Sequence, residues 1–379
     1  MRKREANIEI MRILLFLMMI CLHVVSPYRQ THHEKFTFSW QFTAALASVS
    51  RLCTNGFVLI SGYFFTSAKN KSPLSPAFKL LLPLAAYVPF YFFLDLHVGF
   101  NEALGRVIQG LLSNENHFYH MWYLQVFLVL TLIAPLLAAG LENASRLVHK
   151  YAMIGLLFSA SALPTFTYLT GLNWFDLRLF DGNLLLFIGL FVTGAYIRKY
   201  PPRITARFAG ILFAASELAV VLGAVLYNTR YSPVFIIQMF NGQLASLADA
   251  AWIETEGLSG AFVDAREIFV VAASAAMLIC FAKLRTRDGL FSHVITRISR
   301  RLYGAYIIHV FWIQVFSNIN GSYFNLYSRI WPAKPSYPLY IFGYIGAVAV
   351  CSLLTDWLLS IAYKFIVRFA QKKLLGSEN

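Results

Sequence analysis

The feature that most constrains the fold of this chain is a series of long apolar runs that carry almost no charge. A helix needs about 20 apolar residues to cross the hydrocarbon core of a bilayer. With 58% hydrophobic and only 13% charged residues, the chain lacks the polar surface of a soluble domain. We therefore predict an all-α fold, a polytopic bundle of about ten transmembrane helices. The predicted spans are residues 8–28, 41–66, 78–98, 121–140, 151–170, 182–197, 208–227, 264–283, 302–320 and 337–363.

Basic residues predict the orientation of these spans. When the N-terminus is placed in the cytoplasm, 22 of the 32 Lys and Arg residues fall in cytoplasmic segments and 8 in outer ones. Such an excess is typical of cytoplasmic loops, so both termini are predicted to be cytoplasmic. The net charge of +14 is then explained by topology, and the expected partner is the lipid bilayer rather than a nucleic acid.

We expect a single integral-membrane domain over residues 1–379, with no appended soluble domain and with a first span that is retained rather than cleaved as a signal peptide. All four cysteines fall inside predicted spans and none forms a C-x-x-C pair, so neither a disulfide framework nor a zinc site is expected. The outer-segment histidines, including His117 and His120, lack the further ligands that a metal site needs. No metal is predicted.

The first span contains two ionisable residues that are costly at membrane depth, Arg12 and His23. They are eleven positions apart, so a helix places them on one face and separates them by roughly 16 Å along its axis. Glu9 lies one turn before Arg12 and can pair with it. One interpretation is that Arg12 reaches the inner headgroups and His23 the outer interface; the other is a functional face.

Arg51 lies near the middle of the second span, where its side chain reaches neither membrane surface well. An arginine at that depth is expected to face the bundle interior and a polar or anionic partner. Its segment, RLCTNGFVLISGYFF, also holds small and polar residues, among them Ser61. Such residues either permit close helix packing or line a cavity, and both interpretations stay open.

Two further groups of polar and aromatic residues lie in the fourth and ninth spans. His120, Trp122 and Tyr123 begin the fourth span, and Tyr306 and His309 lie about a third of the way into the ninth. Trp and Tyr at a span end are typical of the aromatic belt, and a lone intramembrane histidine more often makes a helix–helix hydrogen bond than does catalysis. The sequence contains neither a nucleophile elbow nor a phosphate-binding or dinucleotide motif.

Taken in order, these motifs resemble acyltransferase family 3, membrane-bound acyltransferases that modify bacterial surface glycans. The first helix has acid-x-x-Arg with a histidine eleven residues later, and the second has an arginine ten residues before Ser-Gly-aromatic, here Ser61-Gly62-Tyr63. The fourth begins His-x-Trp-aromatic-Leu, and a late helix carries Tyr-x-x-His. The resemblance covers nearly the whole chain; Glu9 stands where aspartate is commoner.

The resemblance implies an O-acyltransferase of the bacterial inner membrane that moves an acyl group, most often acetyl, from cytoplasmic acyl-CoA to a hydroxyl of a surface or lipid-linked polysaccharide. Acyl-CoA is then a substrate, and no cofactor is implied. His23 would be the general base, since histidine titrates near neutral pH. The implied roles are catalytic for His23, Arg12 and Glu9, acyl-CoA binding for Arg51, Ser61 and Tyr63, and acceptor binding for His120, Trp122, Tyr123, Tyr306 and His309.

Two other classes of protein also use polar residues in a helical bundle. A transporter or flippase for a lipid-linked sugar places intramembrane Arg and His along its substrate path, but inverted repeats and broken helices in matching halves are not evident here. A scaffold subunit of a polysaccharide export complex fits the fold, although it leaves Arg51 unexplained.

Overall fold

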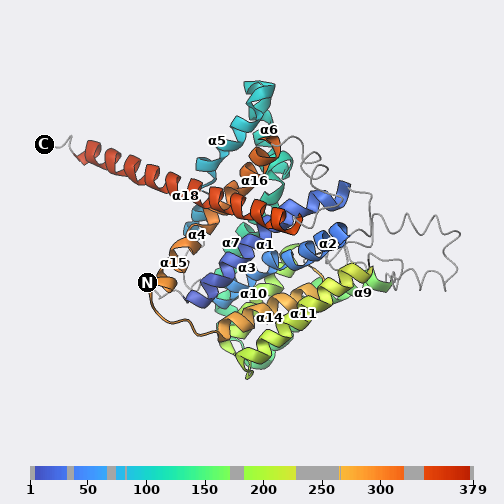
Figure 1. The fold of residues 1–379 in the computed structure, drawn as a ribbon. Helices are drawn as coiled ribbons and strands as arrows, with labels where there is room; N and C mark the ends of the chain where they lie inside the picture. The colour runs from blue at the N-terminus through green and yellow to red at the C-terminus, as the bar shows by residue number, and fades with distance from the viewer. Residues whose placement is uncertain are drawn as a thin grey trace. The chain divides into compact units, whose positions relative to one another are not determined.

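The computed structural model describes residues 5–31, 38–65, 74–81, 83–170, 183–227, 264, 266–319 and 337–375. These residues form helices and no strand (Figure 1). Among them, six segments are helical, long and apolar enough to cross a membrane: Ala6–Val25, Pro76–Val98, Phe100–Asn143, Arg146–Phe166, Ala206–Gly223 and Pro338–Ala362. The predicted all-α membrane bundle is confirmed, while the count of ten spans and the side of the termini stay predictions. Residues 228–263, which the predicted topology places on the outer side, are not among the described residues.

Backbone contacts divide the chain into two compact units, each of which is described by itself. Unit 1 comprises residues Met1–Ala77 and Tyr123–Asp288, and unit 2 comprises Phe78–Trp122 and Gly289–Asn379. The helices of unit 1 are α1 (Ala6–Thr31), α2 (Phe38–Ser50), α3 (Leu52–Tyr63), α7 (Trp122–Asn143), α8 (Arg146–Leu157), α9 (Leu163–Thr170), α10 (Asn183–Lys199), α11 (Ala206–Tyr227) and α14 (Ile268–Lys283). Those of unit 2 are α5 (Leu84–Asp95), α6 (Phe100–Ser113), the 3-10 segment η3 (Asn116–Met121), α15 (Leu290–Ser299), α16 (Leu302–Ile319) and α18 (Tyr337–Leu375). Helix α4 (Leu74–Leu81) crosses the boundary between them.

The predicted second span, residues 41–66, consists of two helices that follow one another directly. Helix α2 ends at Ser50 and α3 begins at Leu52, with Arg51 between them. The Arg51 backbone N–H donates to the carbonyls of both Ala47 and Ser48 at 3.2 Å, so one donor is shared between two acceptors where a continuous α-helix uses one. The apolar run continues through this joint, which is why the sequence predicts a single helix there.

Helix α3 lies at the centre of unit 1, where it packs against α1, α10 and α14. Its contact with α10 is unusually close, because each of the two helices has a glycine that lies against the backbone of the other. A Cβ atom built on Gly62 would lie 2.0 Å from the Phe191 carbonyl oxygen, and one on Gly194 would lie 2.1 Å from the Leu59 carbonyl oxygen. Within a bilayer, helices associate through such close packing of small residues, so Gly62 of the Ser-Gly-aromatic triplet is a packing residue.

In unit 2, an intramembrane acid joins three helices. The Tyr87 hydroxyl of α5 donates to Asp356 Oδ1 of α18 at 2.7 Å, and Arg301, just before α16, donates to Asp356 Oδ2 at 2.9 Å. The same guanidinium donates to the Ser360 hydroxyl at 2.8 Å. Gly304 leaves room for this network, because a Cβ there would lie 1.9 Å from Asp356 Oδ1. The charge of Asp356 is therefore compensated at membrane depth.

Replacing Gly62 by alanine is expected to destabilise unit 1, since the new methyl group meets the Phe191 backbone rather than a movable side chain. Overpacking of this kind costs about 1–3 kcal/mol. Denaturant unfolding in detergent micelles measures the change. Gly140→Ala is the matched control, because nothing lies within 4 Å of its Cβ position and alanine favours the helix by up to about 1 kcal/mol. Equal stability of the two variants would contradict the close α3–α10 contact.

Candidate functional site

Helix α1 carries the predicted catalytic residues Glu9, Arg12 and His23 on one unbroken helix. Arg12 Nη1 donates to Glu9 Oε1 at 2.7 Å, and the Glu9 side chain is only 2% exposed. The predicted pairing of Glu9 with Arg12 is therefore confirmed. The Arg12 guanidinium also lies over the ring of Phe64, 5.6 Å from its centroid, so Arg12 is held from two sides and keeps a side chain that is 26% exposed.

Arg198, in the last turn of α10, also lies near Phe64 and is not among the residues predicted from the sequence. Its Nη1 donates to the Tyr63 hydroxyl at 2.7 Å, and its Nη2 lies 3.1 Å from Glu5 Oε1. The guanidinium stacks on the Tyr63 ring at 4.7 Å and lies 6.0 Å from the Phe64 centroid. Phe64 thus has a guanidinium nearby from each of two helices. We call Glu5, Glu9, Arg12, Tyr63, Phe64 and Arg198 the Arg12–Arg198 cluster.

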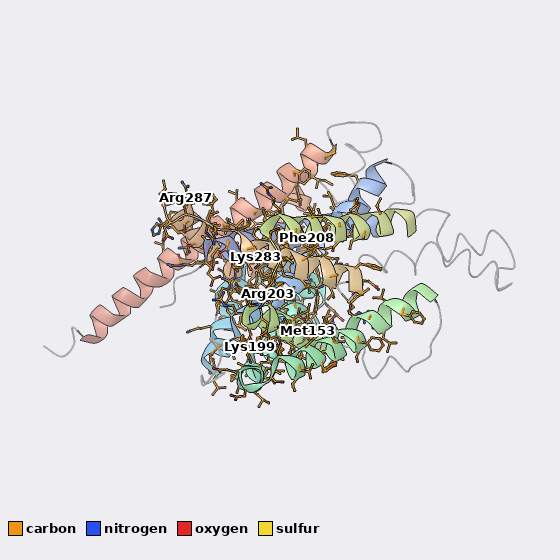
Figure 2. All side chains as sticks on the ribbon, turned by 90° about the horizontal axis from the view of Figure 1, so that it is seen from below. Met153, Lys199, Arg203, Phe208, Lys283 and Arg287 are labelled. Carbon is orange, nitrogen blue, oxygen red and sulfur yellow. The ribbon has the colours of Figure 1, made fainter. Side chains whose placement is uncertain are left out.

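The Arg12–Arg198 cluster lies at the end of unit 1 where α1 begins and where α3, α10 and α14 end. The Asn7 amide donates to the Phe281 carbonyl of α14 at 2.7 Å, which joins these helix ends. Figure 2 shows the basic residues Lys199, Arg203 and Lys283 at the same end of the unit. Lys199 is committed to structure, because its ammonium donates to three carbonyls around the end of α7. Cations and aromatic rings together suit an anionic ligand that carries an aromatic group.

Ser61 and Tyr63 have different surroundings, although the sequence groups them together. The Ser61 hydroxyl donates to the Phe57 carbonyl of its own helix at 2.9 Å, a bond typical of serine inside a membrane helix. Tyr63 is buried and its hydroxyl accepts from Arg198. Tyr63 therefore belongs to the Arg12–Arg198 cluster, whereas the Ser61 hydroxyl is bonded within α3.

Arg51 lies beside the middle part of α1, close to the level of Cys21. Ser50 shares a hydrogen bond with the Cys21 thiol, and Cys21 precedes His23 by two residues on α1. The joint between α2 and α3 is thereby set beside this part of α1. The Arg51 Nε is buried and forms no hydrogen bond within the described part of the chain. A buried guanidinium nitrogen of this kind favours an oxygen-bearing ligand.

Unit 2 brings together three of the residues predicted for the acceptor. His120 Nε2 lies 3.3 Å from the Ile307 carbonyl, the Tyr306 hydroxyl donates to the His120 carbonyl at 2.7 Å, and the rings of His120 and His309 are 5.0 Å apart. Because carbonyl oxygens only accept, His120 carries its proton on Nε2, and His309 carries its own on Nδ1, which donates to the Tyr306 carbonyl at 2.5 Å. Both histidines are almost fully buried.

The aromatic residues that follow His120 divide between the units. Trp122 is the last residue of this part of unit 2, whereas Tyr123 belongs to unit 1. There the Tyr123 ring packs against Phe127 at 5.8 Å and Phe187 at 5.3 Å. Both Trp122 and Tyr123 are partly exposed, but the Tyr123 hydroxyl oxygen is buried, unlike that of a typical aromatic-belt tyrosine. The structure does not place Tyr123 with the His120 group within one unit.

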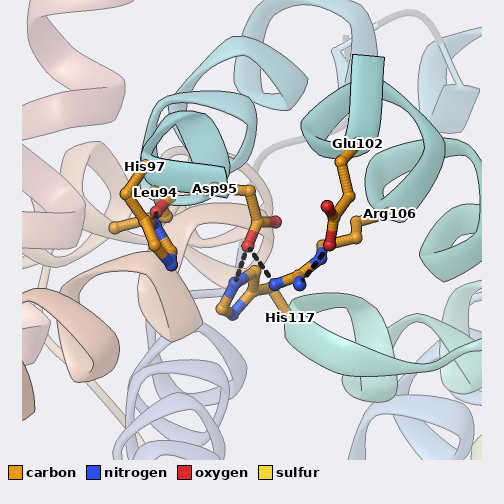
Figure 3. A network of polar contacts seen from close by, with 6 residues as sticks. All are labelled: Leu94, Asp95, His97, Glu102, Arg106 and His117. Carbon is orange, nitrogen blue, oxygen red and sulfur yellow. Dashed lines mark hydrogen bonds and ion pairs between the residues drawn. The ribbon is translucent and has the colours of Figure 1, made fainter. Parts of the chain in front are cut away.

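A second polar network lies beside the His120 group in unit 2 (Figure 3). Asp95, at the end of α5, is 3% exposed, and its Oδ1 lies 3.3 Å from His117 Nε2 and 3.6 Å from Arg106 Nη1. Arg106 also pairs with Glu102 at 2.6 Å. The ring of the buried Tyr91 stacks near His117, with centroids 6.4 Å apart. Asp95 and Arg106 hold the turn between two helices in place.

The sequence contains a signal for some of these unanticipated residues and none for others. Asp95, Glu217 and Asp356 are acids inside apolar runs, and an acid at membrane depth is by itself a reason to suspect function or pairing. Both carboxylate oxygens of Glu217, in α11, are buried and make no hydrogen bond to other described residues. Arg198 follows the run of 182–197 and looks like any basic residue at a span end, so only its contacts reveal it.

The fold and these networks define a multi-pass, helical membrane protein with buried charge at several depths. A family model described as an acyltransferase domain matches residues 5–356, and the chain belongs to this family, acyltransferase family 3. The match runs from Glu5 of the Arg12–Arg198 cluster to Asp356 of the unit 2 network. Searches of curated proteins and of solved structures found no match.

Removing the Tyr63 hydroxyl is expected to weaken the Arg12–Arg198 cluster. Tyr63→Phe takes away the acceptor of the Arg198 hydrogen bond and keeps the stacked ring, so the free energy of unfolding should fall by about 1–2 kcal/mol. A double-mutant cycle with Arg198→Met, measured by denaturant unfolding in micelles, should show that the two losses are not additive.

The matched control for this cycle is Tyr196→Phe with Arg146→Met. That pair also joins a tyrosine of α10 to an arginine, but its bond is 3.5 Å long and exposed, so no measurable coupling is expected. Additive losses in the Tyr63–Arg198 cycle would contradict the contact.

Proposed function

We propose that this protein transfers an acyl group, acetyl in the first instance, from cytoplasmic acyl-CoA to a hydroxyl of a lipid-linked or cell-surface polysaccharide at the outer face of the bacterial inner membrane. Membership of an acyltransferase family supports the reaction class. The observation that carries the proposal is that α1 is one unbroken helix which holds a fixed cation near one end and a histidine about three turns later on the same face.

In the proposed reaction, His23 acts as the general base. It takes the proton of the acceptor hydroxyl while that oxygen attacks the thioester carbonyl carbon. The resulting tetrahedral oxyanion collapses, the C–S bond breaks, and the CoA thiolate takes the proton from the His23 imidazolium. The products are an O-acyl ester and free CoA. Arg51 supports this step, because a guanidinium with a buried Nε close to the level of Cys21 is suited to stabilise an oxyanion.

The Arg12–Arg198 cluster is the proposed entrance for the donor. CoA carries several phosphate charges and an adenine ring, and the cluster offers two guanidiniums and two aromatic rings. Glu9 and Glu5 pair with the guanidiniums and fix their positions. Tyr63 is proposed to bind acyl-CoA through Arg198. Ser61, which bonds its own helix, contributes through packing alone.

The proposed acceptor site in unit 2 comprises His120, Tyr306 and His309, together with Trp122. Polar side chains beside aromatic rings are suited to bind a hydroxyl-rich sugar. Tyr123 is left out of the proposed acceptor site, since it packs within unit 1. No cofactor is proposed beyond the acyl-CoA substrate.

The test of this function uses cells with and without the gene. Their surface glycan is labelled from radioactive acetyl-CoA precursors, and the amount of exported glycan is measured in the same samples. The proposal expects loss of the label with normal export. Loss of export itself would indicate a transporter or an export subunit and would overturn the proposal.

His23→Ala is expected to lower the rate of acyl transfer by at least about 100-fold, because removing a general base typically costs that much. The rate is measured in membrane vesicles supplied with acyl-CoA and acceptor, and the amount of inserted protein is measured by immunoblot. His293→Ala is the matched control, since His293 is an exposed residue of α15 outside every network described above. A His23→Ala variant that retains the parental rate would rule out the general-base role.

A further inference from the structure

Helix α6 is set apart from its neighbours by left-handed residues at both ends. Gly99, just before α6, has φ +99°, and Asn114, just after it, has φ +56°. Among the described residues, no other has a φ in the left-handed range between +20° and +160°. Glycine and asparagine are the residues that adopt this conformation most easily. The chain therefore turns sharply into α6 and sharply out of it, and α6 does not continue the direction of α5.

Along α6 run three faces of different character. Every fourth residue is a large apolar side chain exposed to the surroundings: Phe100 is 64% exposed, Leu104 42%, Ile108 50% and Leu112 77%. A second face, made of Ala103, Val107 and Gly110, is buried. A third face is polar and consists of Glu102, Arg106 and Gln109.

The angles between these faces follow from helix geometry. At 100° per residue, the buried face lies about 100° from the polar face and about 110° from the apolar stripe. The stripe and the polar face each run along most of the helix. The polarity of α6 therefore differs between its faces but is constant along its length. This pattern is typical of an amphipathic helix that lies in the plane of the membrane interface.

We propose that α6 lies along the membrane interface, with its buried face on the protein, its apolar stripe in the lipid and its polar face in water. On the topology predicted from the charges this is the outer interface. The stripe residues are Phe100, Leu104, Ile108 and Leu112, and the occupant of this surface is the bilayer itself.

The apolar stripe is continuous with the apolar surface of a candidate span. Helix α5 belongs to the segment Pro76–Val98, and its Phe93 is 66% exposed. The centroid of the Phe92 ring lies 6.3 Å from that of Phe93 and 5.2 Å from that of Phe100. The stripe therefore begins where the exposed aromatic surface of α5 ends, so the same lipid is expected to cover both.

The polar network in Figure 3 fixes the rotation of α6 about its own axis. Arg106 is held by the buried Asp95 of α5 on one side and by Glu102 of its own helix on the other. On the buried face, the ring of Phe118 fills the space beside Gly110, where a Cβ would lie 2.6 Å from it. With both faces held, the stripe stays directed away from the protein.

Site-directed spin labelling of the full-length chain in vesicles of phosphatidylethanolamine and phosphatidylglycerol tests this placement. The four native cysteines are first replaced, and single cysteines are introduced at Leu104, Ile108, Glu102 and Gln109. Power saturation then compares collision with oxygen, which concentrates in lipid, and with a water-soluble nickel chelate. Leu136, 77% exposed in the span of α7, is the lipid reference, and Arg203, exposed between α10 and α11, is the water reference.

The proposal expects labels at Leu104 and Ile108 to have a several-fold higher oxygen-to-nickel collision ratio than labels at Glu102 and Gln109, and to approach the ratio at Leu136. Equal ratios on both faces would overturn the proposal, whether they match the water reference at Arg203 or the lipid reference at Leu136. Protection of Leu104 and Ile108 from both reagents would show that a protein surface covers the stripe, which also overturns it. Circular dichroism of each labelled variant first shows that its helix content equals that of the unlabelled protein, so that equal ratios cannot come from misfolding.

Discussion

The contact between α3 and α10 is the interaction on which the rest of unit 1 depends. In lipid there is no hydrophobic force between helices, so close packing must supply the attraction. Gly62 and Gly194 allow each helix to approach the other's carbonyl oxygens. The same approach brings Tyr63, the residue after Gly62, against Arg198, four residues after Gly194. The cationic cluster is thus a direct result of a packing contact between two backbones.

Charge at membrane depth follows one rule in both units. An isolated ion in hydrocarbon is costly, and a pair removed from water is stable only when further hydrogen bonds complete it. Arg12 with Glu9 and Arg301 with Asp356 meet this condition, and Arg106, on the proposed water-facing side of α6, pairs with the buried Asp95. In unit 2 the pairs also join separate helices, so they specify which helices associate. Arg51 and Glu217 differ, because each has buried polar atoms with no hydrogen bond among the described residues.

Local patterns in the sequence predict much of this, and long-range contacts account for the rest. The apolar runs predict the helices because a span of about 20 residues is a local property, and the Glu9–Arg12 pair follows from spacing along one helix. The joint at Arg51 was missed, since hydrophobicity does not change across it. The Tyr63–Arg198 hydrogen bond joins residues 135 positions apart, and no periodic pattern in the sequence predicts a contact over that distance. Asp95 and Asp356 were visible as acids within spans, but their partners depend on which helices are neighbours.

The rigidity of α1 has a consequence for the proposed mechanism. Because Arg12 and His23 belong to one continuous helix, their separation of roughly 16 Å cannot shrink when substrate binds. A donor held by its phosphates at the Arg12–Arg198 cluster must therefore reach His23 through an extended arm, and the thioester of CoA sits at the end of such an arm. The joint beside Cys21 puts Arg51 where that arm would end. Under this mechanism the apolar residues between Arg12 and His23 set the distance that the CoA arm has to span, and Arg12 and His23 act on opposite ends of the same donor.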